Sequence, residues 1–372
     1  MYEINQTHLI VDLLDIKENA ESLKVYTSGK LIAVVKADAY GHGVIPVAET
    51  LTSVVDMFAV ATVEEAIELR QADISTPILI LYTPMPEYAE DILLHALTPA
   101  IDNWDLAIRL NDVSEKGDIL SKHTPHGKIR VHVNVNTGMN RSGVCYTETG
   151  EFIERLRTLP NIEVEGIFTH FATAHEEDKS FAHVQLNRFY PLLTIKPRIP
   201  IVHTANSAAT LEIPDSRFNA LRPGLSLYGI YPGEKRALPL YPALTWKTHV
   251  HWIDEIEAGE GVSYGLEYKA PHRIRIAGLR VGFGDGYPRA LSGIGEVLIN
   301  GKRCPILGRI CMDSMVVKLE ESDYVRIGSE VVLLGKQGEE EISIEALAEK
   351  ANTIPYEILT RIGKRVQRIY KS

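Results

Sequence analysis

Lys36 is the residue whose type and position most clearly suggest a chemical role. It directly follows a short apolar run, residues 31–35, that is typical of a buried strand. Two glycines, Gly41 and Gly43, follow it closely and permit a tight turn. An ammonium group at the mouth of a buried strand must be paired, exposed or deprotonated. Partial desolvation favours the neutral, nucleophilic amine of Schiff-base chemistry. A lysine that simply extends from a strand end into water has the same local pattern.

Other polar residues follow predicted strands further along the chain. They are Asn134, Asn136 and Arg141 near the end of residues 129–135, His170 after 164–168, His203, Asn206 and Ser207 at the end of 199–203, and Arg222 and Gly224 after 218–221. Each alone could be a core histidine, an ion-pair partner or a turn glycine. If these residues lie together at one edge of a sheet, they could bind an anion. Ser207 and the backbone amides near Gly224 and Leu225 could then donate hydrogen bonds to a phosphate. The set suggests an anionic cofactor beside Lys36.

The elements that must bring these residues together alternate regularly. Apolar strand-like runs occur at residues 31–35, 57–61, 77–81, 98–101, 129–135, 164–168, 199–203 and 218–221, and segments with helical spacing separate them. This alternation indicates right-handed parallel crossovers. Eight repeats predict an α/β fold, a closed (β/α)₈ TIM barrel with its site at the carboxyl ends of the strands. An open doubly wound sheet is the alternative, but no G-x-G-x-x-G follows the first strand.

A second domain is predicted where the alternation stops, near residues 231–233. Shorter β-rich runs separated by glycine and proline lie at residues 244–252, 273–281, 296–299, 315–319 and 330–334, and they indicate a mainly antiparallel β domain. We therefore expect a barrel domain over residues 1–236 and a C-terminal β domain over residues 237–372. Residues 1–10 could pack with the β domain.

Bulk composition limits the class of protein. The 372 residues are 45% hydrophobic and 24% charged, which is ordinary for a globular chain of two domains. The formal net charge of −10 argues against a nucleic-acid-binding surface. No run reaches membrane-spanning length, and no signal peptide is recognisable. Three cysteines without C-x-x-C spacing suggest reduced thiols. We therefore expect a cytoplasmic protein.

Several motifs extend this picture over essentially the whole chain. They are residues 33–43 (AVVKADAYGHG), 136–139 (NTGM), Arg141, 169–172 (THFA), 221–224 (LRPG), 262–265 (VSYG), 282–286 (GFGDG), 309–313 (RICMD) and 354–357 (IPYE). In type and order they resemble the motifs of alanine racemases. The resemblance implies a fold-type III enzyme that depends on pyridoxal 5′-phosphate, with a barrel followed by a β domain.

The resemblance also implies a role for each matching residue. Lys36 would hold pyridoxal phosphate through a Schiff base and act as one catalytic base. Tyr264, from the β domain of the partner subunit, would be the second base on the opposite face. The cofactor-binding residues would be Lys36, Tyr40, His170, Asn206, Ser207, Arg222, Gly224, Leu225 and Tyr356. Arg141, Met312 and Asp313 would bind the substrate, and Arg222 would face the pyridine nitrogen.

The implied reaction interconverts L- and D-alanine in a homodimer with shared active sites, and supplies D-alanine for peptidoglycan. Two bases on opposite faces move the α-proton without rotating the substrate. A tyrosine has a pKa of about 10, so its phenolate needs nearby positive charge. We expect His170 and Arg141 to provide that charge. The alternatives are a serine or broad-specificity amino-acid racemase, a non-catalytic pyridoxal-phosphate-binding homeostasis protein and a related barrel decarboxylase. Tyr264 and the β domain argue against the homeostasis protein.

Three positions depart from the family pattern. Asn134 stands where many members carry a carbamylated lysine that helps position the equivalent of Arg141, and we expect its amide or a bound anion to fill that place. Phe283 replaces a frequent tyrosine at the entry to the site, and His175 replaces an acidic residue. Two histidine pairs have metal-like spacing, His123 with His126 and His249 with His251. Neither has the carboxylates or cysteines that would complete a site, so no metal is expected.

Overall fold

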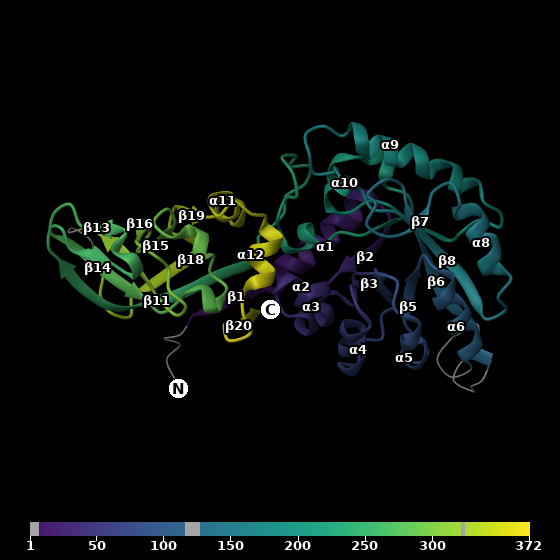
Figure 1. The fold of residues 1–372 in the computed structure, drawn as a ribbon, viewed down its shortest axis with the longest axis horizontal. Helices are drawn as coiled ribbons and strands as arrows, with labels where there is room; N and C mark the ends of the chain where they lie inside the picture. Colours follow the sequence, from purple (N-terminus) through teal and green to yellow (C-terminus); the bar gives the residue numbers. More distant parts are fainter. Residues whose placement is uncertain (1–6, 116–126, 321–323) are drawn as a thin grey trace. The chain divides into compact units, whose positions relative to one another are not determined.

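The computed structural model describes residues 7–115, 127–320 and 324–372 (Figure 1). The chain forms two compact units. One contains residues 15–39 and 44–242. The other contains the described residues up to 14, residues 40–43 and residues 243–372. In the part of the chain that is described, no helix has both the length and the apolar character needed to cross a membrane.

The first unit is built on eight parallel strands. They are β2 (Lys30–Val34), β3 (Met57–Val60), β4 (Ile78–Ile80), β5 (Thr98–Ile101), β6 (Ile129–Asn136), β8 (Ile162–Phe168), β9 (Ile201–His203) and β10 (Ala220–Leu221). Their order is β10-β2-β3-β4-β5-β6-β8-β9, and the short β7 (Val144–Cys145) pairs with β6. A parallel bridge between Asn206 and Arg222 links the segments that follow β9 and β10. The predicted (β/α)₈ barrel is therefore confirmed.

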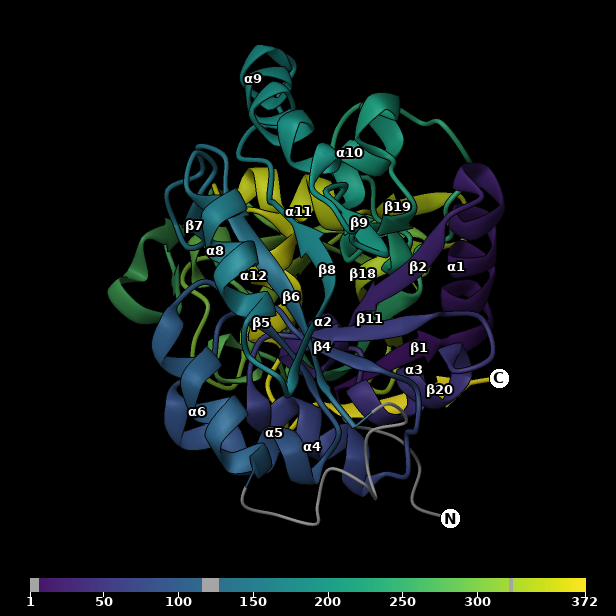
Figure 2. The same cartoon turned by 90° about the vertical axis from the view of Figure 1, so that its right-hand side faces the viewer.

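Helices follow the strands and cover the outside of this sheet, as Figure 2 shows for α3 to α6 and α8. The helical elements are α1 (Leu13–Thr27), α2 (Lys36–Tyr40), α3 (Val44–Leu51), α4 (Val63–Gln71), η1 (Pro86–Tyr88), α5 (Ala89–Leu94), α6 (Trp104–Glu115), α8 (Thr149–Arg157), α9 (Ser180–Phe189), η2 (Tyr190–Thr194), α10 (Ser207–Glu212), η3 (Pro214–Ser216) and η4 (Leu225–Tyr228). In α4, the Thr62 side chain caps the first turn by accepting from Glu65 N, while Val63, Ala66 and Leu69 form its buried face.

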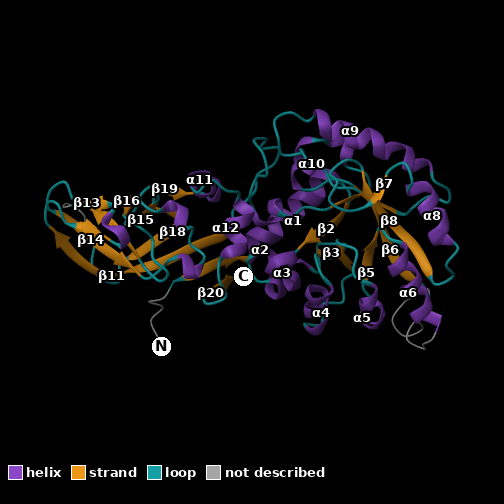
Figure 3. Cartoon of the chain, in the orientation of Figure 1, coloured by secondary structure: helices purple, strands orange, loops and turns teal. Residues whose placement is uncertain are grey.

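The second unit is mainly antiparallel (Figure 3). Its strands are β1 (His8–Asp12), β11 (Leu244–Ile256), β12 (Gly261–Val262), β13 (Tyr268–Lys269), β14 (Ile274–Leu279), β15 (Glu296–Ile299), β16 (Lys302–Leu307), β17 (Met315–Leu319), β18 (Glu330–Gln337), β19 (Glu340–Ile342) and β20 (Gln367–Lys371). The main sheet runs β19-β18-β15-β16-β17-β14-β11-β1-β20. The β1–β20 pair is parallel. Trp246 and Tyr287 are buried in its core with ring centroids 5.6 Å apart.

Short helices complete this unit. They are η5 (Tyr264–Leu266), η6 (Phe283–Asp285), η7 (Arg289–Leu291), α11 (Ile344–Lys350) and α12 (Pro355–Arg361). Strand β16 was not among the strands expected from the sequence. Pro305 interrupts its apolar pattern, yet β16 still pairs antiparallel with β15, where Pro305 lies opposite Glu296. A proline weakens the sequence signal for a strand because it cannot donate to the ladder.

Candidate active site

Lys36 lies partly buried just beyond β2. The preceding residue, Val35, donates its backbone N–H to Ala59 O at 2.9 Å and so continues the ladder with β3. Burial lowers the pKa of Lys36 because it disfavours the ammonium form. The charge of Arg141 lowers this pKa further, while Glu65 acts in the opposite direction. The neutral amine is therefore more accessible than in water, as Schiff-base chemistry requires.

The backbone after Lys36 forms a left-handed turn. Residues 37–40 have φ values between 52° and 54°, which costs an L-residue roughly 1–2 kcal/mol each. Glu65 on α4 holds the start of this turn, because its carboxylate accepts from Ala37 N and Ala61 N, both at 2.7 Å. Such strain persists only where surrounding contacts enforce it, and it clusters at functional sites. The sequence pattern predicted a turn near Gly41 and Gly43, but not the left-handed conformation of residues 37–40 or the role of Glu65.

The aromatic ring of Tyr82 lies near the cationic groups of both Lys36 and Arg141. Lys36 Nζ lies 5.9 Å from the centroid of the Tyr82 ring, and Arg141 Cζ lies 5.3 Å from the same centroid. Two like charges are thus both placed against the ring's electron-rich system. Tyr82 is not among the site residues expected from the sequence. Its position two residues beyond β4, at the carboxyl end of a barrel strand, was the available signal.

The loop that carries Arg141 is held by side-chain hydrogen bonds. Asn134 Nδ2 donates to Ser142 Oγ at 3.0 Å, and Gly143 N donates to Asp102 Oδ2 at 3.0 Å. The amide of Asn134 therefore contacts the loop beside Arg141. Arg141 itself is exposed and forms no ion pair within the described residues, so its guanidinium is available to a carboxylate.

Arg222 directly follows β10 and is buried. Both Nη groups of its guanidinium donate hydrogen bonds. Its Nη1 donates to His203 Nδ1 at 2.8 Å and to the His203 carbonyl. Its Nη2 donates to Thr169 O at 2.6 Å and to Thr204 O at 3.4 Å. Burial and then the charge of Arg141 lower the pKa of Arg222 to about 9, so it remains a cation at pH 7. Within the described residues its Nε–H has no acceptor, which fits a ligand nitrogen such as that of a pyridine ring.

Backbone N–H groups of the loop after β10 donate to the hydroxyl of Ser207. Ser207 Oγ accepts from Gly224 N at 2.9 Å and from Ser226 N at 3.3 Å. Its own O–H is therefore left to donate, and within the described residues it has no acceptor. Asn206 caps α10, because its Oδ1 accepts from Ala209 N at 3.0 Å. A buried serine hydroxyl directed by two amides, beside the start of η4 at Leu225, fits a phosphate group.

His170 follows β8 and corrects an expectation. Burial, followed by the charges of Arg222, Arg141 and Lys36, lowers the pKa of His170 to about 3. The imidazole is therefore neutral at pH 7 and does not supply the positive charge expected of it. Arg141 remains as the cation of that pair.

The other predicted site residues lie in the second unit. The rings of Tyr40 and Tyr356 are 5.8 Å apart, and burial raises the pKa of Tyr356. Tyr264 is 71% exposed and begins η5, where the preceding Ser263 donates to Arg309 O at 2.6 Å. Most of the Tyr264 side chain is therefore exposed to solvent.

The loop next to this segment contains Met312 and Asp313. Met312 is 56% exposed, and Met312 O accepts from Gly284 N at 2.8 Å. Asp313 pairs with Arg365 at 2.8 Å. Ser263 Oγ also lies 3.3 Å from the sulfur of Cys311, so the Tyr264 segment and this loop are adjacent. The exposed Phe283, one of the departures from the family pattern, donates its backbone N–H to Cys311 O.

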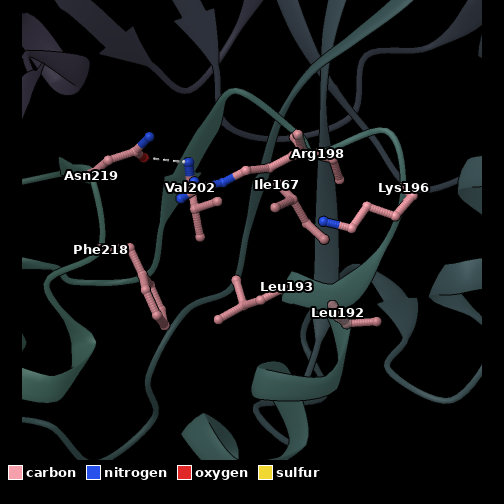
Figure 4. Close-up of a pocket in the computed structure, with 9 residues that line it drawn as sticks. Ile167, Leu192, Leu193, Lys196, Arg198, Val202, Phe218 and Asn219 are labelled. Atoms are coloured by element: carbon pink, nitrogen blue, oxygen red, sulfur yellow. Dashed lines mark hydrogen bonds between the residues drawn. The ribbon is translucent and has the colours of Figure 1, made fainter.

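A separate cavity of about 450 Å³ lies away from these residues (Figure 4). Leu192 and Leu193 of η2 line it, together with Val202 and Asn219 near the amino-terminal ends of β9 and β10. Asn219 Oδ1 accepts from Val202 N at 2.7 Å. None of the predicted site residues lines this cavity.

The described residues contain no group of three or more histidine, cysteine, aspartate or glutamate side chains placed to hold a metal ion. His249 instead stacks on His8 with centroids 6.1 Å apart. His123 and His126 lie outside the described residues. His175, the third departure, pairs with Glu176 at 3.0 Å.

Fold and site together define a class of protein: a TIM barrel joined to a β domain, with a partly buried lysine after the first barrel strand and, after the last, a loop whose backbone amides donate to a buried serine hydroxyl. Residues 11–232 match the family model "Alanine racemase, N-terminal domain", and residues 243–370 match "Alanine racemase, C-terminal domain". The chain belongs to the alanine racemase family. It is an isomerase of the amino-acid racemase class.

Individual relatives agree over the full length. The chain is 41% identical to the alanine racemase of Halothermothrix orenii, covering 97% of this chain and 96% of the relative. It is 42% identical to that of Carboxydothermus hydrogenoformans, covering 97% and 98%. The structure of alanine racemase from E. faecalis superposes with a TM-score of 0.91 at 34% identity, covering 100% of both chains. That from Bartonella henselae, which has covalently bound pyridoxal phosphate, gives 0.89 at 29% identity, covering 98% and 99%.

Proposed function

We propose that this chain interconverts L-alanine and D-alanine with pyridoxal 5′-phosphate as its cofactor. The observation that carries the proposal is the similarity to alanine racemases across both domains. The site supports it through the lowered pKa of Lys36, the Ser207 hydroxyl as a donor to a phosphate, and the Arg222 Nε–H as a donor to a ring nitrogen. The first test is a racemisation assay with L-alanine and a D-amino-acid readout, and the absence of D-product would overturn the assignment.

Each cofactor contact in this proposal has a residue of fitting chemistry. The Lys36 amine would bind the aldehyde carbon. The Ser207 hydroxyl, which the Gly224 amide orients, the Leu225 amide and the phenols of Tyr40 and Tyr356 would hold the phosphate. The Arg222 Nε–H would donate to the pyridine nitrogen, and His170 and Asn206 would line the same site. When bound, pyridoxal phosphate delocalises the electron pair that remains after the α-proton leaves.

Two bases complete the proposed reaction. The Lys36 amine takes the α-proton from one face, and the Tyr264 phenol returns a proton to the other, with the roles reversed in the opposite direction. Arg141, the backbone amide of Met312 and Asp313 position the substrate. Because each base serves one face, Tyr264→Phe should abolish racemisation yet retain α-deuterium exchange for one enantiomer. Equal loss of exchange for both enantiomers would contradict the assignment of two bases.

A second copy of this chain would supply Tyr264, so the enzyme would be a homodimer with shared sites. Support comes from the exposure of Tyr264, Met312 and Phe283 on the same unit. Mixing inactive Lys36→Ala and Tyr264→Phe subunits tests this proposal. Half of the dimers would be mixed and each would hold one intact site, so about a quarter of wild-type activity should return. No recovery from subunits shown to exchange would mean that both bases come from one chain.

Substrate breadth is the main alternative. Tyr356 would crowd the substrate side chain, which favours alanine, but a methyl against a hydroxymethyl group differs by only about 1–3 kcal/mol. A faster rate with L-serine than with L-alanine would identify a serine or broad-specificity racemase instead. The match of residues 243–370 to the family's C-terminal domain argues against a non-catalytic homeostasis protein. A cytoplasmic location and a supply of D-alanine for peptidoglycan complete the proposal.

A further inference from the structure

Arg222 carries a buried charge without a neighbouring carboxylate. Its side chain is almost inaccessible, with 3% of the residue exposed. All its acceptors are neutral: the ring of His203 and the carbonyl groups of His203, Thr169 and Thr204. A buried cation is costly unless a counter-charge compensates it. The Phe168 ring, 5.0 Å from Arg222 Cζ, is also neutral. Within the described residues Arg222 forms no ion pair, so a compensating negative charge must lie further away.

A chain of side chains connects Arg222 to such a counter-charge. His203 Nε2 lies 2.7 Å from His132 Nδ1, and His132 Nε2 lies 3.4 Å from Glu165 Oε2. His203 is on β9, His132 on β6 and Glu165 on β8. Both histidines are fully buried. Three strands therefore contribute one residue each to a path from Arg222 to Glu165.

The direction of every hydrogen bond in this path follows from Arg222. A guanidinium can only donate, so His203 Nδ1 must accept, and the neutral ring then carries its hydrogen on Nε2. That hydrogen points to His132 Nδ1, which must also accept. The remaining hydrogen of His132 therefore lies on Nε2, toward Glu165. Burial lowers the pKa of both histidines, which agrees with two neutral rings.

Glu165 is suited to end the path as an anion. Burial alone would raise its pKa, but the hydrogen bond from His132 and the charges of Arg130 and Lys30 hold the pKa of Glu165 below its usual value. Arg130 Nη1 lies 3.3 Å from Glu165 Oε1. A carboxylate at the end of a hydrogen-bond chain strengthens each acceptor before it, because successive bonds polarise one another.

We propose that His132 and Glu165 are positioning residues that, acting through His203, orient Arg222 and provide its remote counter-charge. The consequence for catalysis rests on the proposed function, in which Arg222 donates to the pyridine nitrogen. A purely structural role would leave the protonation behaviour of Arg222 unchanged. The charged or titratable groups that face Arg222 are His203, His170 and Arg141, whereas His132, Arg130 and Lys30 face Glu165.

The first experiment reads the tautomers directly and needs no activity. Proton–nitrogen NMR of ¹⁵N-histidine-labelled protein, with and without pyridoxal phosphate, should show His132 and His203 as neutral Nε2–H rings from pH 6 to 9. Assignment uses His132→Gln and His203→Gln. A hydrogen on Nδ1 of either ring, or a cationic ring in this range, would overturn the proposed chain.

The second experiment uses Glu165→Gln, which keeps an acceptor for His132 but removes the charge. The matched control is Glu163→Gln on the same strand. In the holoenzyme, kcat for alanine should fall about tenfold with Glu165→Gln, while KM changes less than about twofold. Loss of the negative charge disfavours protonated Arg222, so the alkaline limb of kcat/KM should move to lower pH. The control should do neither, and Glu165→Asp should restore part of the wild-type profile.

Two outcomes separate this inference from the proposed function. If wild-type protein racemises alanine and Glu165→Gln behaves as Glu163→Gln does, the positioning role is wrong and the proposed function stands. If wild-type protein makes no D-alanine, the proposed function fails. The NMR tautomers still decide whether the hydrogen-bonded path from Arg222 to Glu165 exists. His132→Phe provides the final check, because in that background Glu165→Gln should no longer move the alkaline limb. A full shift there would overturn coupling through His132.

Discussion

Lys36 Nζ lies 5.9 Å from the ring centroid of Tyr82, although 45 residues separate the two in the chain. Tyr82 presents the same ring to Arg141. One aromatic side chain therefore organises both the lysine proposed to bind the cofactor and the arginine proposed to bind the substrate. A π-face accepts both cations without neutralising either, which leaves each available for a ligand.

This relationship predicts the effect of removing the ring. Tyr82→Leu should raise KM for alanine about threefold to tenfold, because each cation–π contact contributes about 0.5–1 kcal/mol and Arg141 loses its support. Tyr82→Phe keeps the ring and should stay within about twofold of wild type. Steady-state kinetics in both reaction directions provides the measurement. Equal effects of the two variants would show that the hydroxyl matters, not the ring.

Glu65 should be needed for the left-handed turn after Lys36. Glu65→Ala removes the acceptor of Ala37 N and Ala61 N and should lower the free energy of unfolding by about 2 kcal/mol. Affinity for pyridoxal phosphate should fall with it, since the turn directly follows Lys36 and contains Tyr40. Urea unfolding and cofactor titration measure the two effects. Glu64→Gln, at the neighbouring exposed position, is the control and should change stability by no more than about 0.5 kcal/mol.

Gly143 should be essential to the loop that carries Arg141. Its φ is 108°, and an added Cβ would lie 2.6 Å from Asn136 N. Gly143→Ala should therefore cost about 1–3 kcal/mol of stability and raise KM for alanine. Gly150 on α8 has open space around its Cβ position, so Gly150→Ala should be neutral or stabilising by up to about 1 kcal/mol. Thermal unfolding of both variants, with kinetics of the first, distinguishes a strained loop from general sensitivity to alanine.

His170 should make the fold sensitive to acid. Its pKa is about 3 in the folded protein against 6.5 as the ordinary value, so the unfolded chain binds more protons in this range. The free energy of unfolding should therefore fall as pH drops from about 6.5 toward 3. His170→Gln should lose less stability than wild type between pH 7 and 5, as measured by urea unfolding of cofactor-free protein. The exposed His183→Gln is the control, and parallel curves for wild type and His170→Gln would refute the argument.

Local sequence patterns predicted the barrel well because each buried strand is itself a run of apolar residues. The eight runs counted from residue 31 all correspond to strands, and the position of Lys36 after the first of them follows directly from its apolar neighbours. The strands of the β domain were harder to predict from the sequence. Strand β16, with Pro305 inside it, has a weak local signal and forms because β15 and β17 pair with it on either side.

The sequence by itself determined the order of strands, the residue types at their carboxyl ends and, through its motifs, the family. Tertiary structure decided which of those residues have altered protonation. His170 looked like a source of positive charge, but three cations and burial keep it neutral. Glu65, His132 and Glu165 carry no local signature, because their roles depend on partners that are distant in the sequence. Contacts, strain and pKa values arise from distances between side chains, and the fold alone sets those distances.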